Sequence, residues 1–217
     1  MNITKKEFAQ RLKAGQLAIC LIGMSGIGKT YRSLQLKKLG FRHICCDKLI
    51  AKHLNLPTKE KNLALWMGQP YAPGYTKRAQ KYLRQEAFAT QKALRHIKHN
   101  TIIDTTGSVI YLSEKIQKLL KKSTLIVYLQ ANQTSIKQLF KVYTTNPKPV
   151  IWGNQLQKQK SETSQMALTR CYPKLLRFRA KKYKKLADIT LPFSVIYNYH
   201  STSRQFLTAI KNQLKNQ

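Results

Sequence analysis

Acidic residues are scarce in this chain, whereas basic residues are abundant. The 217 residues include 8 Asp and Glu against 40 Lys and Arg, which gives a formal net charge of +32. Such a charge attracts nucleotides, phosphorylated metabolites, nucleic acids and acidic membranes. The basic residues are spread along the whole chain, and no arginine-rich tail or RNA-binding motif stands out. The charge therefore indicates anionic partners in general and does not identify one of them. A lysine-rich, acid-poor proteome would also explain it.

Cysteine pairs and long apolar runs are also lacking. The four cysteines, at positions 20, 45, 46 and 171, form no C-x-x-C pair, so we expect neither a zinc site nor a disulfide framework. A reducing, cytoplasmic location fits this cysteine usage. The apolar run over 17–24 is too short to span a membrane, so we expect neither a signal peptide nor membrane insertion. The five histidines are scattered, and we expect no metal site among them.

Glycine is concentrated in one short stretch. Residues 23–30 read GMSGIGKT and fit the pattern G-x-x-x-x-G-K-[ST], in which backbone N–H groups surround a phosphate. Lys29 would reach the β- and γ-phosphates, and the hydroxyl of Thr30 would complete a Mg²⁺ shell. The alternative, a glycine-rich turn that binds nothing, leaves unexplained why an apolar strand candidate precedes it and a helix-compatible segment follows it. We therefore expect nucleotide binding, with phosphate contacts from Gly23, Ser25, Gly26, Ile27, Gly28, Lys29, Thr30 and Tyr31.

Short apolar segments alternate with helical patterns along the chain. This alternation predicts an α/β fold, a three-layer α/β/α sandwich around a mostly parallel five-stranded sheet of the P-loop NTPase type. We expect one domain over 1–217, with a substrate-side loop near 55–80 and a lid near 146–165, and we expect a monomer. The predicted strands cover 18–22, 41–46, 101–103, 125–129 and part of 189–197, and the longest predicted helices cover 77–99 and 166–186.

Carboxylates follow two of the predicted strands. The chain has three aspartates, and two of them, Asp47 and Asp104, come directly after apolar strand runs. In parallel sheets ligands bind at the carboxyl ends of the strands. Asp104 is therefore a candidate catalytic acid that holds Mg²⁺ opposite Thr30, although it would also suit a turn before Gly107. Asp47 would orient or deprotonate a substrate hydroxyl, or would serve as an N-cap for the helix that follows it. We favour the catalytic role for both.

With these residues placed, the chain resembles the P-loop small-molecule kinases, and among them shikimate kinase. The segment GMSGIGKTYRSLQLKKLGFRHICCDKLI is similar to that family's phosphate loop, first helix and second strand, and FRAKKYKKLADITL is the most similar C-terminal segment. The resemblance implies ATP and Mg²⁺ as cofactors. It also implies that Asp47 contacts the phosphorylated hydroxyl, that Gly107 belongs to a substrate loop, and that Arg179 binds a substrate carboxylate. In the segment KPVI, Lys148 takes the place of a lid arginine, and Arg170 would be a second cation near the lid.

Several features depart from the family pattern. Cys45 stands where the family has an aspartate associated with Mg²⁺, and Leu83 aligns best with a second substrate-binding arginine, although Arg78 and Arg84 are close. The family's glycine triplet is reduced to one glycine at 107, and the loop over 66–75 has no clear counterpart. ATP use survives these changes, whereas recognition of shikimate does not follow from the sequence.

The leading hypothesis is therefore an ATP-dependent phosphotransferase acting on a hydroxyl of a small, anionic metabolite. The alternatives are a nucleotide-dependent, nucleic-acid-associated P-loop protein, such as a polynucleotide kinase or an RNA-binding switch, and a nucleotide-binding protein without transferase activity. We interpret most of the basic segment 170–185 as a solvated helix face, and Arg179 is the exception that the alignment gives a reason for; the nucleic-acid alternative is supported mainly by the net charge.

Overall fold

The chain folds around one parallel sheet of five strands. The structure, a computed structural model, describes residues 3–216 except 59, 146–147 and 198–200. The strand order is β2-β3-β1-β4-β5, and every neighbouring pair is parallel. The strands are β1 (Ala18–Ile22), β2 (Arg42–Cys45), β3 (Thr101–Asp104), β4 (Leu125–Leu129) and β5 (Ile189–Leu191).

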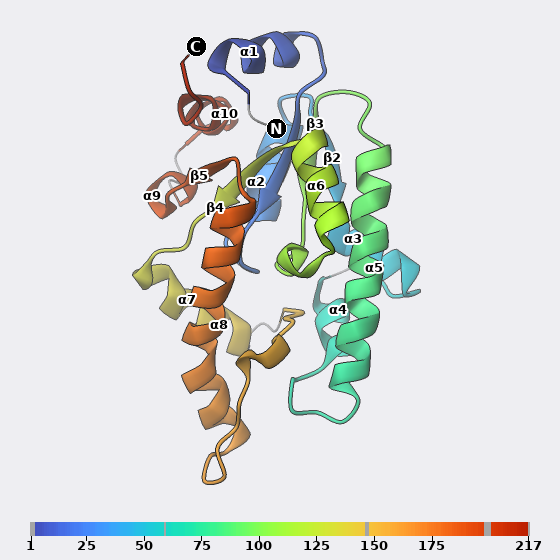
Figure 1. The fold of residues 1–217 in the computed structure, drawn as a ribbon, viewed down its shortest axis with the longest axis vertical. Helices are drawn as coiled ribbons and strands as arrows, with labels where there is room; N and C mark the ends of the chain where they lie inside the picture. Colours follow the sequence, from blue (N-terminus) through green and yellow to red (C-terminus); the bar gives the residue numbers. More distant parts are fainter. Residues whose placement is uncertain (1–2, 59, 146–147, 198–200, 217) are drawn as a thin grey trace.

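Helices cover both faces of this sheet (Figure 1). Along the strand order of the sheet, the connection from β1 to β2 runs in one direction, whereas the connections from β2 to β3, from β3 to β4 and from β4 to β5 run in the opposite direction. Because such crossovers are right-handed, α2 lies on one face, while α5, α6 and α8 lie on the other. The predicted three-layer α/β/α sandwich is confirmed. The helices are α1 (Lys5–Lys13), α2 (Lys29–Lys37), α3 (Cys46–His53), α4 (Glu60–Met67), α5 (Tyr75–Arg95), α6 (Glu114–Ser123), α7 (Gln133–Thr145), α8 (Ser164–Leu186), α9 (Phe193–Ile196) and α10 (Ser203–Asn212), with the 3₁₀ turns η1 (Val109–Tyr111) and η2 (Gly153–Gln155).

The burial of each strand follows its place in the sheet. The central strands β1 and β4 are buried along their whole length, which is why their sequences AICLI and LIVYL carry no polar alternation. The edge strand β2 is only partly buried. Because all five strands run in parallel, their carboxyl ends share one edge of the sheet, where polar loops meet.

Three segments differ from the sequence-based expectation. The predicted loop near 55–80 contains α4 and the start of α5, so its irregular part is short. One side of α4 is buried through Leu63, Ala64 and Met67. This apolar pattern is too short to predict a helix from the sequence, because Gly, Pro and aromatic residues typical of a loop follow it directly. The helix predicted over 77–99 begins at Tyr75, after Gly74 with φ 76°, and ends at Arg95. The last strand is limited to Ile189–Leu191, because Pro192 follows it and α9 begins.

Candidate active site

The loop between β1 and α2 has a conformation that depends on glycine. Gly23, Gly26 and Gly28 have φ angles of 147, 84 and 98°, which L side chains rarely adopt. A Cβ atom at Gly23 would also lie 2.8 Å from the carbonyl oxygen of Leu129. The glycines therefore keep side chains off the loop at the N-terminus of α2, where the positive end of the helix favours an anion.

Lys29 lies across this loop. It is the first residue of α2 and is buried, and its Nζ donates hydrogen bonds of 3.0 Å to the carbonyl oxygens of Gly23 and Met24. The ammonium group is thereby held at the mouth of the loop, close to the position expected for a bound phosphate. The side chain of Ile27, by contrast, is fully buried in the core. A phosphate contact from Ile27 would therefore come from its backbone.

A cavity of about 170 Å³ opens beside the loop and gathers residues from four parts of the chain. Lys29 and Thr30 come from α2, Asp47 from α3, and Asp104 from the end of β3. The structure therefore brings together the catalytic and metal-binding candidates of the sequence analysis. The full lining is Ser25, Gly26, Gly28, Lys29, Thr30, Tyr31, Asp47, Asp104 and Lys148.

Asp47 lies inside the first turn of α3. The N-cap of α3 is Cys45, so the interpretation of Asp47 as the N-cap is wrong. Its Oδ1 accepts a hydrogen bond of 3.0 Å from the hydroxyl of Tyr82 on α5. A carboxylate at this position is favoured by the helix N-terminus, and the tyrosine fixes one of its two oxygens.

Asp104 is the last residue of β3 and is only 3% exposed. Its Oδ2 lies 3.7 Å from Nε2 of His43 and has no hydrogen-bond partner in the part of the chain that the structure describes. This oxygen therefore does not cap a turn. The neighbouring Cys45 thiol is also largely buried, and burial, with the negative charges of Asp104 and Asp47, raises the pKa of Cys45 to about 12.

Glu86 is a buried carboxyl group that the sequence analysis missed. It lies on α5 and is fully buried. The hydroxyl of Ser108 donates to its Oε2 at 2.5 Å, and the hydroxyl of Thr106 donates to its Oε1. The sequence does contain a signal for it: Glu86 lies at helical spacing among Tyr82, Ala89 and Ala93, which form the buried face of α5. A charged residue on such a face is expected to have hydrogen-bond partners, because charged residues are rarely buried without them. Glu86 thereby positions the loop that contains Gly107.

The titration of Glu86 should affect the stability of the fold. Burial raises the pKa of Glu86 from 4.5 to about 7, although the two hydroxyls partly offset this effect. Because the folded protein then binds this proton more tightly than the unfolded chain, the free energy of unfolding decreases as the pH rises from about 4.5 to about 7. The decrease approaches roughly 3 kcal/mol at 1.36 kcal/mol per pKa unit.

We expect Glu86→Gln to lose this pH-dependent contribution while it keeps an acceptor for one hydroxyl. Urea unfolding at about pH 5 and about pH 8 would measure it, as the difference between variant and wild type at each pH. Glu114→Gln is the matched control, because the Glu114 side chain is 90% exposed on α6 and should leave the difference near zero. Equal pH dependence in Glu86→Gln and wild type would contradict the assignment.

Arg179 and Gly107 lie together, as the sequence analysis expected of two substrate-side residues. Arg179 is 2% exposed on α8, and its guanidinium donates to the carbonyl oxygens of Gly107, at 3.1 Å, and Ile151, at 2.5 Å. The hydroxyl of Tyr183 also donates to Gly107. The ring of Tyr111 lies 5.6 Å from the guanidinium carbon and its hydroxyl interacts with Arg179, whereas Arg179 Nε has no hydrogen-bond partner among the described residues. Arg179 thus joins two loops to α8 and keeps one buried donor without a partner.

The predicted lid segment packs against the rest of the fold. Its positions 146 and 147 lie outside the described residues, and Lys148 lines the cavity beside the P-loop. Trp152 is buried; its backbone N–H donates to the hydroxyl of Tyr75 at 3.2 Å, and its indole donates to that of Tyr143 at 3.3 Å. These contacts hold the segment between α5 and α7.

Arg170 does not line the P-loop cavity. Its Nε forms an ion pair of 2.5 Å with Glu162, and its Nη2 donates to the carbonyl oxygen of Gln157 at 2.7 Å. Both partners belong to the lid segment, so Arg170 attaches this segment to α8. The hydrogen bond from Arg170 lowers the pKa of Glu162 to about 2.

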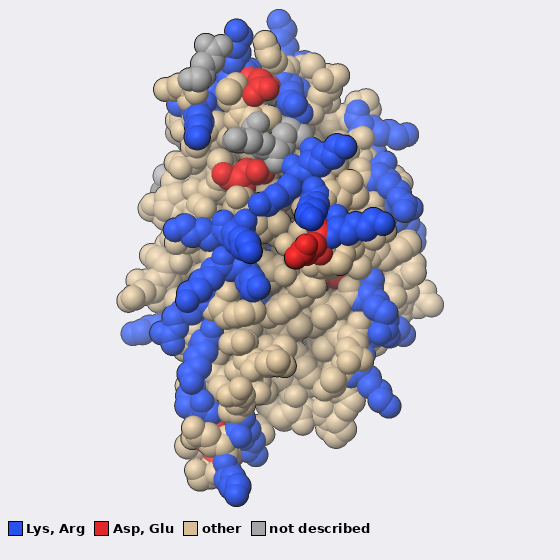
Figure 2. All heavy atoms as spheres, viewed as in Figure 1, with Lys and Arg blue, Asp and Glu red and all other residues tan. Residues whose placement is uncertain are grey.

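A second cavity, of about 390 Å³, lies between α6 and α8 and is lined by Lys118, Lys121, Lys182 and Lys185. Figure 2 shows lysine and arginine side chains spread over the visible face, with a run of them along α8. Among the described residues, none of the helices combines the length and the apolar character that a membrane crossing requires.

The fold and this site define a P-loop kinase, and comparisons with known proteins agree. A sequence model of the shikimate kinase family matches residues 25–192, so the chain belongs to the shikimate kinase family. No curated protein sequence matches it. Shikimate kinase from Acinetobacter baumannii in complex with shikimate is similar in structure, with a TM-score of 0.64, 18% identity, and coverage of 94% of this chain and 99% of that one.

Two further shikimate kinase structures show the same fold. The enzyme from Bacteroides thetaiotaomicron has a TM-score of 0.58 at 16% identity, over 90% of this chain and 95% of that one. The enzyme from Aquifex aeolicus has a TM-score of 0.53 at 17% identity, over 90% of this chain and 97% of that one. The predicted relationship is confirmed: this chain is a P-loop kinase of the shikimate kinase type.

Proposed function

We propose that this kinase transfers the terminal phosphoryl group of ATP, with Mg²⁺, to a hydroxyl of a small anionic metabolite. The observation that carries the proposal is the single cavity lined by Lys29, Thr30, Asp47 and Asp104. It joins a phosphate loop, a cation, oxygen ligands and a candidate base within one space. Phosphoryl transfer needs these parts, since it depends on positioning and on stabilisation of the transferred charge.

Each residue has a role that follows from its chemistry. Lys29 would stabilise negative charge on the transferred group. Thr30 and Asp104 offer oxygen ligands on the same cavity, and the unpartnered Oδ2 of Asp104 suits Mg²⁺, which prefers oxygen. Asp47 would accept or orient the proton of the acceptor hydroxyl, with the bond from Tyr82 holding its carboxylate in place.

The acceptor would lie between Asp47 and Arg179. One similar structure contains shikimate, a hydroxylated carboxylate, and a molecule of that kind would use both a base for its hydroxyl and a cation for its acid group. Arg179 Nε, which has no hydrogen-bond partner among the described residues, supports an anionic group at this end. Leu83 in place of a second arginine leaves the identity of the acid open.

The test is nucleotide binding followed by turnover. Calorimetry with ATP and Mg²⁺ should detect binding, and a coupled assay should detect ADP release only when a hydroxylated acid is added. Shikimate and a panel of other hydroxylated carboxylates serve as acceptors. Binding without acceptor-dependent ADP release would contradict the transferase and favour a protein that only binds nucleotide.

We expect Asp104→Asn to weaken the response to Mg²⁺. The neutral amide removes a charged oxygen ligand, so the Mg²⁺ concentration at half-maximal activity should rise by roughly 10- to 100-fold, the range that lesser changes around metal ligands produce. A Mg²⁺ titration at saturating ATP measures it, and thermal melts should differ little. An unchanged titration would remove Asp104 from the metal site.

We expect Arg179→Lys to raise the KM for the acceptor more than it lowers kcat. Lysine keeps the charge but loses the planar fork, and one charge-assisted hydrogen bond is worth about 1.5–3 kcal/mol, which corresponds to a KM increase of about tenfold or more. Initial rates against acceptor concentration measure the split between KM and kcat. Since Arg179 also holds Gly107 and Ile151, Tyr111→Phe provides a second, milder test of the same end of the site. Unchanged KM in both variants would place the anionic group elsewhere.

A second candidate function, nucleic-acid binding, is favoured by the lysine-lined cavity between α6 and α8. Such binding should weaken steeply as salt rises, with a slope set by the number of contacted phosphates. Titration of a labelled RNA at two salt concentrations distinguishes this function from the kinase activity.

A further inference from the structure

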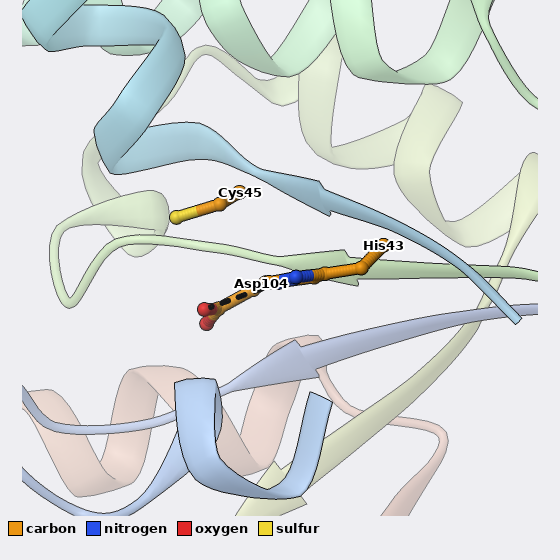
Figure 3. Close-up of side chains that lie close together, drawn as sticks. All are labelled: His43, Cys45 and Asp104. Carbon is orange, nitrogen blue, oxygen red and sulfur yellow. Dashed lines mark ion pairs between the residues drawn. The ribbon is translucent and has the colours of Figure 1, made fainter. Parts of the chain in front are cut away.

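Three side chains of different ligand types meet at the carboxyl ends of β2 and β3. In the parallel pairing of these strands, Cys45 lies opposite Asp104. His43 and Cys45 are two residues apart on β2, so their side chains leave the sheet on the same face. Figure 3 shows the imidazole of His43 directed at the carboxylate of Asp104, with the Cys45 sulfur beside them. One nitrogen, one sulfur and one oxygen atom lie within 4.8 Å of one another.

Two of these atoms are buried and have no hydrogen-bond partner. The His43 side chain is 9% exposed and the Asp104 side chain 3%. Both His43 Nε2 and Asp104 Oδ2 lack a partner within the described ranges, and they lie 3.7 Å apart. Buried polar atoms are costly to leave unsatisfied. A cation bound by both atoms would satisfy them.

Two cavities border the residues of the cluster. His43 and Cys45 line a cavity of about 240 Å³ that also contacts α3 and α5, with Lys48, Lys92 and His96 on its walls. Asp104 lines the P-loop cavity on the other side. Arg42, Lys48 and Lys92 on this cavity oppose a cation unless its ligands carry negative charge. A thiolate and a carboxylate would supply two negative charges, which balance a divalent ion.

We propose that His43, Cys45 and Asp104 form a binding site for a borderline-soft divalent cation, of which Zn²⁺ is the best match. Zinc binds sulfur, imidazole nitrogen and carboxylate oxygen, and catalytic-type sites use three protein ligands and leave one position open. With zinc–ligand distances of about 2.0–2.3 Å, tetrahedral ligand atoms stand roughly 3.3–3.8 Å apart. The spacing here, within 4.8 Å, would require a contraction of up to about 1.5 Å on metal binding. Mg²⁺ disfavours this set, because it prefers oxygen ligands.

The site overlaps the Mg²⁺ site of the proposed function at Asp104 and differs from it in His43 and Cys45. His43 and Cys45 do not line the P-loop cavity. A cation held by all three side chains would engage the oxygen that the proposed function assigns to Mg²⁺. The inference does not depend on kinase activity, so the two are tested separately.

Cobalt provides the direct probe, because a Co²⁺–thiolate bond gives a near-ultraviolet charge-transfer band and tetrahedral Co²⁺ gives intense visible bands. The full chain is stripped of metal with a chelator, titrated with Co²⁺ without nucleotide, and then titrated with Zn²⁺ to displace the cobalt. The variants are Cys45→Ser and His43→Gln. The matched controls are Cys46→Ala, which changes the adjacent buried thiol, and His96→Gln, which changes a histidine on the same cavity.

We expect wild type and both controls to show the thiolate band with one equivalent of Co²⁺, and Zn²⁺ to remove it. Cys45→Ser should lose the band, and His43→Gln should weaken affinity on the order of 100-fold. Circular dichroism melts of the metal-free variants confirm that they fold. Absence of the band in wild type, its survival in Cys45→Ser, or its loss in either control would overturn the site. Calorimetry with ATP and Mg²⁺ on the same metal-free protein reports on the proposed function alone.

Discussion

Lys29→Ala should reduce phosphotransfer by on the order of 10³-fold or more while the fold remains intact. The side chain places its ammonium over the P-loop through hydrogen bonds to Gly23 and Met24. A preorganised group that stabilises developing charge is worth 10²–10³ in kcat when it is a neutral donor, and a full cation should be worth at least as much. Steady-state ADP release with saturating acceptor measures the loss.

The matched control for this variant lies on the same helix. Lys37 is exposed near the end of α2, so Lys37→Ala removes an equal charge and should retain wild-type turnover. Thermal melts of both variants show whether a loss of turnover reflects unfolding. We expect little change in the melting temperature, because the two hydrogen bonds of Lys29 only connect its side chain to the adjacent loop. A folded Lys29→Ala protein with wild-type turnover would contradict the kinase mechanism.

Asp47→Asn should lower kcat by roughly 10²–10⁴-fold, the usual contribution of a positioned general base. Asparagine has nearly the same shape and can still accept the hydrogen bond from Tyr82, so the loss isolates the charge. The affinity for ATP, measured without acceptor, should remain within a few-fold of wild type, because the proposed role of Asp47 concerns the acceptor hydroxyl.

Asp188→Asn is the control for this second variant. Asp188 Oδ2 accepts a hydrogen bond of 2.8 Å from the backbone N–H of Ile126, at the end of the sheet opposite the P-loop. Its substitution should change stability and leave kcat close to wild type. If Asp47→Asn weakened ATP binding as strongly as turnover, Asp47 would belong to the nucleotide site instead.

The sequence predicted best those features that are local or that follow from sheet geometry. GMSGIGKT is contiguous, so its conformation could be inferred from glycine positions alone. Asp47 and Asp104 follow apolar strands, and the rule for carboxyl ends of parallel strands placed them at one edge before the structure did.

The features that were missed depend on contacts between distant segments. Glu86 is positioned by Thr106 and Ser108, which no local pattern joins to it. Arg170 was expected as a cation near the lid, but its particular contacts with Glu162 and Gln157 become visible only once the lid segment folds back on α8.

The cysteine and histidine spacing suggested no metal ligands, because it carried no short C-x-x-C pattern. The parallel register of β2 and β3 instead sets Cys45 beside Asp104, and alternation along β2 adds His43. Strand register is a tertiary property, and the linear spacing of these residues does not reveal it.

Direct detection of the phosphorylated product tests the central claim most plainly. The protein is incubated with ATP, Mg²⁺ and each hydroxylated carboxylate in turn, and mass spectrometry follows the acceptor. At least one acid should gain a single phosphoryl group with wild type and should not with Lys29→Ala. Conversion of ATP to ADP and free phosphate with no phosphorylated acid, or equal product from both proteins, would contradict it.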